Sequence, residues 1–550
     1  MPHPSITLDS VSYAWPDGTI ALSHASGSFG AGRTGLVGRN GSGKTTLLRL
    51  VAGELAPTSG HIVTTGDVAY LPQRLTLEVD RPVAELLGIA DALFALRAIE
   101  SGDACPRHFD AVGDDWDVEA RATVALAEAG LAADALDRRV GELSGGEAVL
   151  TAVAGIRLRG APITLLDEPT NNLDREARAR LYEQVRGWRG ALVVVSHDVA
   201  LLDLMDDTAE LYGSELSVFG GPYSAWREWL ETEQGAARQA ERAAAQAVRR
   251  EKRERIENET KLARRVSVGK RARVNKRVPR AVAKLRQRSA QVSAGKLRGD
   301  MADRESAARD ALDAAERRVR DDDAVRIDLP DPGVPAARRI ATLGPWTVQG
   351  PERVALIGPN GIGKTTALEW LVASACNNSA FPPRATGGRR GNTGVAARAV
   401  APRLSCDAVV AHTDRVGYLP QRVDGLDDDA SVLENVRAAA PDAPPADVRN
   451  RLARFLIRGA TVDRAVRSLS GGERFRVALA RLLLADPPPQ LLVLDEPTNN
   501  LDLDTVDQLV EALGAYRGAV LVVSHDDVFL DRLGLDATLE LGPEGIAVRR

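Results

Sequence analysis

The sequence predicts an α/β protein with two similar domains in tandem, joined by a long α-helical hairpin. Five short motifs occur twice, in the same order, which indicates a duplication. Each half alternates short apolar strands with helical stretches, the pattern of a mostly parallel sheet covered by helices. The 550 residues, 44% hydrophobic and 27% charged, are enough for several domains with buried cores.

The repeated motifs fall in two halves, residues 1–230 and 324–550. Strands predicted at 33–37 and 353–357 lead into glycine-rich loops, and strands at 163–166 and 491–494 lead into acidic pairs. The paired motifs are GRNGSGKTT (38–46) and GPNGIGKTT (358–366), YLPQ (70–73 and 418–421), LSGGE (143–147 and 469–473), LLDEPTNNLD (165–174) and VLDEPTNNLD (493–502), and VVSHD (194–198 and 522–526).

The glycine-rich loops match G-x-x-x-x-G-K-[ST], which is specific when a strand precedes it and a helix follows. Glycines let backbone N–H groups close around phosphates without Cβ clashes. We expect Lys44 and Lys364 to reach the β- and γ-phosphates, and Thr45 and Thr365 to ligate Mg²⁺. The residues expected to bind nucleotide in the two loops are Gly38, Asn40, Gly41, Ser42, Gly43, Lys44, Thr45 and Thr46, and Gly358, Asn360, Gly361, Ile362, Gly363, Lys364, Thr365 and Thr366.

An acidic pair follows each of the strands predicted at 163–166 and 491–494. Asp167 and Asp495 end the strands, where a carboxylate can hold Mg²⁺. Glu168 and Glu496 come next and are expected to point to the other side of the extended chain. That position suits a general base that polarises the attacking water.

The five motifs together resemble the ATP-binding cassette superfamily over both halves, here cassette one (1–230) and cassette two (324–550). LSGGE alone indicates a helix N-terminus able to bind an anion. The resemblance implies that the cassettes pair head to tail within a monomer, with each ATP between one P-loop and the opposite LSGGE. It implies a lid glutamine, which also senses Mg²⁺, at Gln73 and Gln421, and a switch histidine at His197 and His525. The implied LSGGE contacts are Ser144, Gly145, Gly146, Ser470, Gly471 and Gly472.

A basic block lies between the cassettes, within residues 231–323. From Thr260 to Gly299 there is no Asp or Glu, so the block carries a charge of +14. Since the net charge of the chain is −5, the rest of the chain carries −19. This asymmetry predicts a polyanionic partner, with nucleic acid the first candidate. The basic residues are Lys261, Arg264, Arg265, Lys270, Arg271, Arg273, Lys276, Arg277, Arg280, Lys284, Arg286, Arg288, Lys296 and Arg298.

The flanks of this block carry alanines at helical spacing, so residues 231–323 predict two long antiparallel helices joined by an irregular basic tip. Gly269, Pro279, Gly295 and Gly299 are expected to interrupt the middle. A solvated coiled-coil spacer is the alternative, but it does not require a block without acids.

Two cassettes in one chain, a charged helical linker and no predicted membrane span resemble the ABC-F subfamily. This implies a cytoplasmic ATPase that binds the ribosome (rRNA and P-site tRNA) through residues 261–298 and inserts its linker toward the peptidyl-transferase centre. Residues 264–299 are similar to the linkers of members that give antibiotic resistance by ribosome protection. The alternatives are a housekeeping translation factor of the same subfamily, the ATPase of a drug-export transporter, and a DNA-associated cassette protein.

The two cassettes are not equivalent in sequence. Trp15, or else Tyr13, is expected to stack on adenine in cassette one, whereas the stretch taken as its counterpart, 325–339, has no aromatic. Ile362 stands where a small residue is usual in the second P-loop. The second LSGGE is followed by Arg-Phe-Arg, and the first by Ala-Val-Leu. Head-to-tail pairing places all these departures at one site, so we expect the Lys44 site to dominate turnover.

Other features limit the functional classes. Cys105, Cys376 and Cys406 are too few for a disulfide framework or a thiolate metal site. No signal segment is visible at the N-terminus. Cassette two has an extra stretch near 377–403, rich in Gly, Arg, Pro and Ala, which predicts a disordered surface insertion of unassigned function.

Overall fold

The computed structural model describes residues 4–73, 75, 79–171, 173–274, 280–320, 329–377, 408–423, 425–499 and 501–549. It divides into two compact units, one made of Met1–Tyr223 with Ala324–Arg550 and the other of Ser224–Asp323. Within the described ranges, no helix is long and apolar enough to cross a membrane. The predicted insertion lies outside the described residues from position 378 onward.

Cassette one is built on a six-stranded sheet in the order β5-β6-β7-β3-β8-β9, in which only β9 is antiparallel to its neighbour. A three-stranded antiparallel sheet, β2-β1-β4, accompanies it. The strands are β1 (Ile6–Ala14), β2 (Ile20–Phe29), β3 (Gly32–Val37), β4 (Ser59–Thr64), β5 (Val68–Leu71), β6 (Ile163–Asp167), β7 (Ala191–Val195), β8 (Asp207–Tyr212) and β9 (Glu215–Phe219).

The central strands β6 and β7 of cassette one are buried along their whole length, as apolar runs in a parallel sheet should be. The helices are α1 (Lys44–Val51), α2 (Val83–Leu87), α3 (Ala90–Glu100), α4 (Pro106–Val112), α5 (Val118–Ala129), α6 (Gly145–Arg159), α7 (Arg175–Arg186) and α8 (Val199–Leu202), with 3₁₀ segments η1 (Ala133–Asp137) and η2 (Val140–Glu142).

Cassette two repeats this plan, with a six-stranded sheet β14-β15-β16-β12-β17-β18 and a three-stranded sheet β11-β10-β13. The predicted α/β duplication is therefore confirmed. The strands are β10 (Arg339–Leu343), β11 (Trp346–Gln349), β12 (Arg353–Ile357), β13 (Val409–Ala411), β14 (Val416–Leu419), β15 (Leu491–Asp495), β16 (Ala519–Val523), β17 (Ala537–Gly542) and β18 (Gly545–Arg549). The helices are α11 (Lys364–Asn377), α12 (Val432–Arg437), α13 (Pro445–Arg454), α14 (Gly471–Leu483), α15 (Leu503–Ala515) and α16 (Asp527–Arg532), with 3₁₀ segments η4 (Gly459–Asp463) and η5 (Val466–Ser468).

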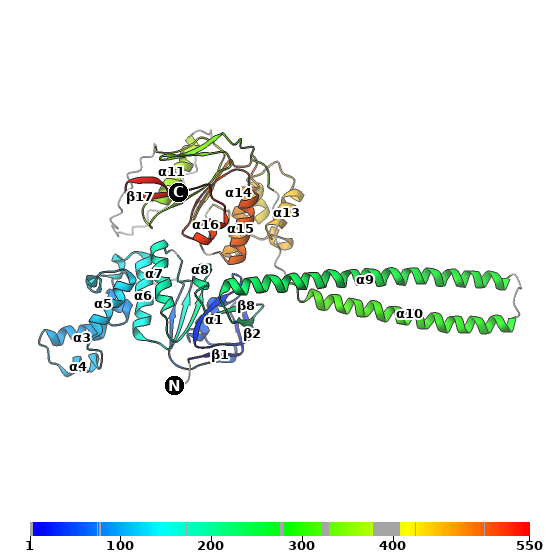
Figure 1. Ribbon diagram of the computed structural model, residues 1–550, viewed down its shortest axis with the longest axis horizontal. Helices are drawn as coiled ribbons and strands as arrows, with labels where there is room; N and C mark the ends of the chain where they lie inside the picture. Colours follow the sequence, from blue (N-terminus) through cyan, green and yellow to red (C-terminus); the bar gives the residue numbers. More distant parts are fainter. Residues whose placement is uncertain are drawn as a thin grey trace. The chain divides into compact units, whose positions relative to one another are not determined.

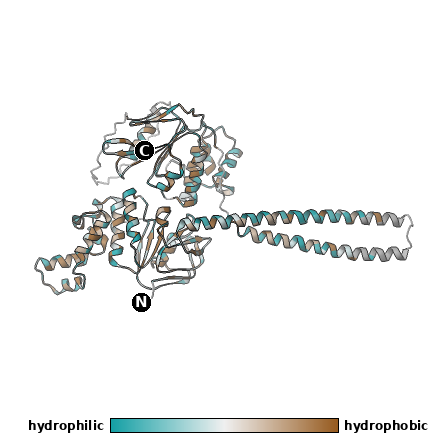
Figure 2. Cartoon of the chain, in the orientation of Figure 1, coloured by the Kyte–Doolittle hydropathy of each residue, from teal (hydrophilic) through white to brown (hydrophobic). Residues whose placement is uncertain are grey.

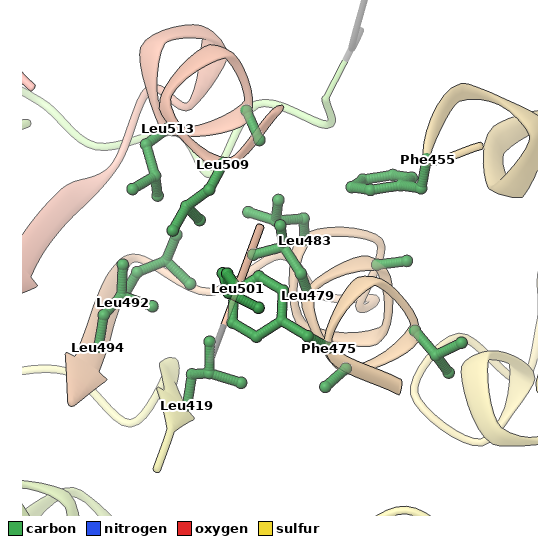
Figure 3. Packing of buried hydrophobic residues seen from close by; sticks show 14 of the residues in the cluster. Leu419, Phe455, Phe475, Leu479, Leu483, Leu492, Leu494, Leu501, Leu509 and Leu513 are labelled. Carbon is green, nitrogen blue, oxygen red and sulfur yellow. The ribbon is translucent and has the colours of Figure 1, made fainter. Parts of the chain in front are cut away.

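The helix that follows the second LSGGE is anchored in a hydrophobic core of cassette two. Phe475 on α14 is 4% exposed and packs with Leu479 and Leu501 in a cluster shown in Figure 3. A buried phenylalanine contributes about 3–5 kcal/mol relative to alanine. This packing fixes the direction in which the N-terminus of α14 points.

The linker consists of two long antiparallel helices, α9 (Tyr223–Val274) and α10 (Arg280–Glu316), which lie side by side (Figure 1). Arg255 Nε of α9 lies 2.7 Å from Glu305 Oε2 of α10, and Gln234 Nε2 donates to the Arg318 carbonyl beyond the end of α10. Hydrophilic and hydrophobic residues are interspersed along the coloured parts of both helices, as Figure 2 shows. The two predicted helices are confirmed.

The prediction that Gly269, Gly295 and Gly299 interrupt the linker helices is wrong. Gly269 lies inside α9, and Gly295 and Gly299 lie inside α10. A glycine in a helix interior costs about 1 kcal/mol relative to alanine, which a long helix can absorb. Pro279 lies outside the described residues, and so do most side chains of the predicted basic tip.

Candidate functional site

Both glycine-rich loops form the tight turn between strand and helix that the motif predicts. A Cβ added to Gly38 would lie 2.5 Å from the Leu211 carbonyl oxygen, and one added to Gly358 would lie 2.5 Å from that of Leu541. No side chain fits at either position. Helix α1 then begins at Lys44 with no side-chain cap, which leaves its first N–H groups available to an anion.

The two P-loop lysines are buried and held by the loops themselves. Lys44 Nζ donates to the carbonyl of Gly38 at 2.6 Å, and Lys364 Nζ donates to that of Gly358 at 2.7 Å. Burial lowers the pKa of both ammonium groups, while nearby carboxylates, Glu168 and Glu496 foremost, raise it. Each positive charge therefore stands where a phosphate would compensate its desolvation.

The acidic pair sits at the end of the central strand in both cassettes. Strands β6 and β15 end at Asp167 and Asp495, as predicted. Glu168 and Glu496, however, have φ values of 51° and 47°, so the chain is left-handed there and not extended as we expected. The Glu168 amide donates to the Val195 carbonyl of the neighbouring strand at 2.8 Å, which ends the strand. Left-handed residues other than glycine are rare and gather at functional sites.

A histidine stands beside each of these glutamates. His197 Nε2 lies 3.1 Å from Glu168 Oε1, and His525 Nε2 lies 3.5 Å from Glu496 Oε1. Burial lowers the pKa of both histidines to about 3, so both imidazoles are neutral at pH 7. Burial also raises the pKa of Glu168 to about 8 and that of Glu496 to about 7.

The aspartates fit a divalent cation. Asp167 Oδ1 and Asp495 Oδ2 are buried and have no hydrogen-bond partner among the described residues. Burial raises the pKa of both carboxyl groups, and hydrogen bonds with Thr45 and Thr365 respectively lower it. A buried carboxylate with a free oxygen beside a threonine hydroxyl is the oxygen-rich environment that Mg²⁺ prefers.

Residues of both cassettes line a cavity of about 440 Å³ at the first P-loop. Of the residues expected at this site, Gly38 and Ser42 do not line it. Those that do are Trp15, Asn40, Gly41, Gly43, Lys44, Thr45, Thr46, Gln73, Asp167, Glu168 and His197 from cassette one and Ser470, Gly471 and Gly472 from cassette two. The cavity also has walls that we did not predict, at Thr19, Ile20, Ala21, Asn171 and Val195.

A second cavity, of about 350 Å³, lies at the other P-loop. The predicted residues that line it are Asn360, Gly361, Gly363, Lys364, Thr365, Thr366, Gln421, Asp495, Glu496 and His525. Leu173 and Asn499 also line it, whereas Gly358, Ile362, Ser144, Gly145 and Gly146 do not. The second cavity thus has no LSGGE residue and no aromatic in its described wall.

Trp15 and not Tyr13 faces the first cavity. The Tyr13 ring packs edge-on against Trp15, with ring centroids 5.2 Å apart. The stretch that we took as the counterpart in cassette two, 325–339, is misplaced. The equivalent hairpin is formed by β10 and β11, which pair Leu343 with Trp346. Trp346 packs against the hydrophobic core and does not line the second cavity. This hairpin is also shorter than the one formed by β1 and β2.

The remaining sequence departures have structural explanations. Ile362 belongs to the core of cassette two, whereas Ser42, its counterpart, has a buried hydroxyl without a partner among the described residues. Arg474, in the basic segment after the second LSGGE, lies 2.6 Å from Asp428 of its own cassette. Ala148 in cassette one is fully buried. The basic segment therefore stabilises α14 locally and does not line the first cavity.

Comparison with known proteins identifies the chain. A family profile described as "ABC transporter" matches residues 22–171 and 345–499, which is more than half of the chain. The tylosin resistance ATP-binding protein TlrC of Streptomyces fradiae is 31% identical over 96% of this chain and 95% of its own. ABC transporter F family member 5 of Arabidopsis thaliana is 28% identical, covering 91% and 70%. The chain belongs to the ATP-binding cassette family, in its ABC-F branch.

This ABC-F protein is therefore an ATPase whose cassettes bind ATP. The energy-dependent translational throttle protein EttA of Escherichia coli is 28% identical to it over 96% of this chain and 90% of its own. An archaeal ribosome recycling factor, aABCE1, solved with a ribosomal stalk protein, shares the fold with a TM-score of 0.52 at 20% identity, covering 98% of this chain and 89% of its own.

Sequence reasoning missed Asn171 and Asn499, although both lie in the repeated DEPTNNLD motif and could have been assigned from that repetition. Asn171 N donates to the Glu168 carbonyl at 3.2 Å, and Asn499 N donates to that of Glu496 at 3.2 Å. These matched turns hold the two glutamates in their left-handed conformation.

Replacing Trp15 by alanine should raise the KM for ATP about tenfold with little change in kcat. Stacking of a base on an aromatic side chain is worth about 1–3 kcal/mol, and its loss removes ground-state binding. Steady-state ATPase assays across ATP concentrations measure it. Trp116→Ala, an exposed tryptophan outside the cavity, is the control. An unchanged KM in Trp15→Ala would show that adenine does not stack there.

Proposed function

We propose that this ABC-F protein is a cytoplasmic, ribosome-associated ATPase that hydrolyses ATP at two sites shared between its cassettes. In this proposal the linker, through residues 261–298, approaches the peptidyl-transferase centre and contacts rRNA and P-site tRNA. The consequence is antibiotic resistance by ribosome protection. The single observation that carries the proposal is the acid-free +14 block carried between the cassettes on a helical hairpin.

The chemistry of each site divides among matched residues. Glu168 and Glu496 polarise the attacking water, and His197 and His525 contact the γ-phosphate from beside them. The P-loop lysine of each site balances the charge of the phosphates, and at the Lys44 site the LSGGE amides of cassette two add to it. Bound Mg²⁺ supplies charge neutralisation of the β- and γ-phosphates. The residues that would hold it are Thr45, Gln73 and Asp167 at one site and Thr365, Gln421 and Asp495 at the other.

The charge pattern supports a nucleic-acid partner. Polyphosphate backbones release counterions when Lys and Arg bind them, so a block without acids gives strong, salt-dependent association. The similarity to TlrC, named for tylosin resistance, supports the resistance role. The similarity to EttA, named as a translational throttle, favours a housekeeping translation factor as the second candidate.

Co-sedimentation with ribosomes tests the proposal. The Glu168→Gln/Glu496→Gln protein should pellet with ribosomes in ATP and remain in the supernatant without nucleotide, because paired cassettes that cannot hydrolyse ATP stay closed. Replacing Lys261, Arg264, Lys296 and Arg298 by glutamine should weaken this association and its dependence on salt. Glutamine at Arg238, Arg242, Arg249 and Arg250, outside the acid-free block, is the matched control.

No association under any nucleotide condition would refute the ribosome as the partner. Susceptibility to a panel of ribosome-targeting antibiotics, with and without expression, then separates the two candidates. Resistance that the Glu168→Gln/Glu496→Gln protein does not give supports ribosome protection. An unchanged susceptibility together with ATP-dependent ribosome binding supports the translation factor.

A further inference from the structure

Arg178 lies on α7, just after the segment of cassette one that reaches the Lys364 cavity. Its Nε donates to the Leu173 carbonyl at 3.3 Å, and its Nη1 lies 3.5 Å from Asp198 Oδ2. The two charged side chains are 12% and 8% exposed. Leu173 lines the wall of the cavity that contains Lys364. The guanidinium therefore ties this wall to the SHD segment of cassette one.

Asp198 is itself held firmly. It caps the N-terminus of α8 by accepting from the Leu201 amide at 3.2 Å, and it accepts from the Tyr182 hydroxyl at 2.6 Å. Burial, and next the charge of Asp198, raises the pKa of Tyr182 well above its ordinary value. The hydroxyl stays protonated and keeps donating. Arg178 and Tyr182, one turn apart on α7, thus hold the same carboxylate.

The cluster continues into cassette two. Arg175 of α7 forms an ion pair with Asp527 of α16, which brings the two helices together. Burial raises the pKa of Asp526, the Phe529 amide lowers it, Asp198 raises it again, and Arg178 lowers it. Arg178 and Asp198 of cassette one therefore both act on the pKa of Asp526, the aspartate of the second VVSHD motif. Carboxylates that are partly withdrawn from water are costly without a nearby positive charge, which Arg178 supplies to Asp198.

The other half of the duplication lacks this cluster. Matching DEPTNNLD in the two cassettes places Leu503, Val506 and Val510 at the positions of Arg175, Arg178 and Tyr182. Matching VVSHD places Val199 at the position of Asp527. Leu501, the counterpart of Leu173, does not line the Lys44 cavity. The polar cluster therefore belongs to one of the two ATP sites.

We propose that Arg178 of cassette one is a positioning residue of the Lys364 site, where it holds the Leu173–Asp174 segment against the P-loop of cassette two. Asp174 Oδ2 accepts from the Asn360 amide of that loop at 3.3 Å, so the segment and the loop are in direct contact. The arrangement strengthens the site that has neither an LSGGE wall nor an aromatic wall. This inference rests on the proposed hydrolysis of ATP at both sites.

Kinetics in single-site backgrounds test the inference. In the Glu168→Gln protein, which keeps only the Lys364 site intact, Arg178→Met should raise the KM for ATP about five- to tenfold and change kcat less than about twofold. In the Glu496→Gln protein the same substitution should change KM less than about twofold. Arg178→Lys should recover part of the loss, since its ammonium still neutralises Asp198. Arg186→Met, an exposed arginine on the same helix, is the matched control.

The outcomes separate the roles. Equal effects of Arg178→Met in both backgrounds, or no effect in either, would overturn the positioning role. If Arg178→Met does not fold, Tyr182→Phe, which removes one hydroxyl, should raise KM in the Glu168→Gln protein only, by a smaller factor. No turnover in the Glu168→Gln protein itself would overturn the proposed two-site hydrolysis and this inference with it. Turnover with a KM that neither variant changes would overturn this inference alone.

Discussion

Glu168→Gln should lower steady-state ATP turnover by about 10²–10⁴-fold, whereas Glu496→Gln should lower it only a few-fold. A glutamine keeps the shape of the side chain but cannot accept the proton of the attacking water, which is what a general base contributes. The difference follows from the walls of the two cavities. The Lys44 cavity has Ser470, Gly471 and Gly472 of the opposite LSGGE in its wall, and the described wall of the Lys364 cavity has no LSGGE residue.

Initial rates at saturating ATP, measured on each single variant and on the double variant, check this result. Glu142→Gln, an exposed glutamate paired with Arg138, is the control for a change of charge. Saturating ATP removes any difference in binding between the sites, so the comparison reports on hydrolysis. Equal losses in Glu168→Gln and Glu496→Gln would show that the sites contribute equally and would contradict the asymmetry.

Most residues of both cavities could be predicted, because their chemistry restricts residue type at fixed spacing. Lys44 follows a loop in which only glycine fits at position 38. Asp167 ends an apolar strand whose parallel register with its neighbour is fixed. The function of such positions can be predicted from the residues next to them in the sequence. The matched positions in cassette two follow from the repeat, and so does the α/β fold.

Other features depend on contacts between distant segments and were not predictable. The left-handed Glu168 results from its amide bonding Val195, far along the chain, and from the turn at Asn171. The hairpin formed by β10 and β11 was predicted at the wrong position, because its strands are short and give a weak period-2 pattern. Helix α9 passes through Gly269 because a long, partly packed helix overrides a local preference of about 1 kcal/mol.

The residues that line the second cavity could also not be predicted in full from the sequence. Both LSGGE segments form the same capping box, in which Ser144 and Ser470 accept from Glu147 and Glu473 amides. Locally they are indistinguishable, and the motif assigns the same role to both. Only the packing of the cassettes distinguishes them, since one serine lines a nucleotide cavity and the other does not.

Ser470→Arg should therefore abolish most ATP turnover, by about 10²-fold or more, whereas Ser144→Arg should cost much less. An arginine at Ser470 enters the wall opposite Lys44 and fills space that the phosphates need, while it also blocks the free amides of α14. Both substitutions remove the same N-cap, which costs about 1 kcal/mol of stability in either cassette. The pair is thus matched for its effect on folding.

Thermal unfolding of both variants and their ATPase rates give the measurement. Similar melting temperatures with unequal rates would locate the effect in the cavity across the cassettes, since Ser470 and Lys44 come from opposite halves of the chain. Ser470→Ala removes the serine hydroxyl without filling the cavity. It should therefore lower turnover less than Ser470→Arg. Rates that fall equally in Ser144→Arg and Ser470→Arg would mean that both LSGGE segments meet ATP during turnover. In that case the wall of the Lys364 cavity must close further than the structure shows, and the two sites would differ in their resting geometry and not in their chemistry.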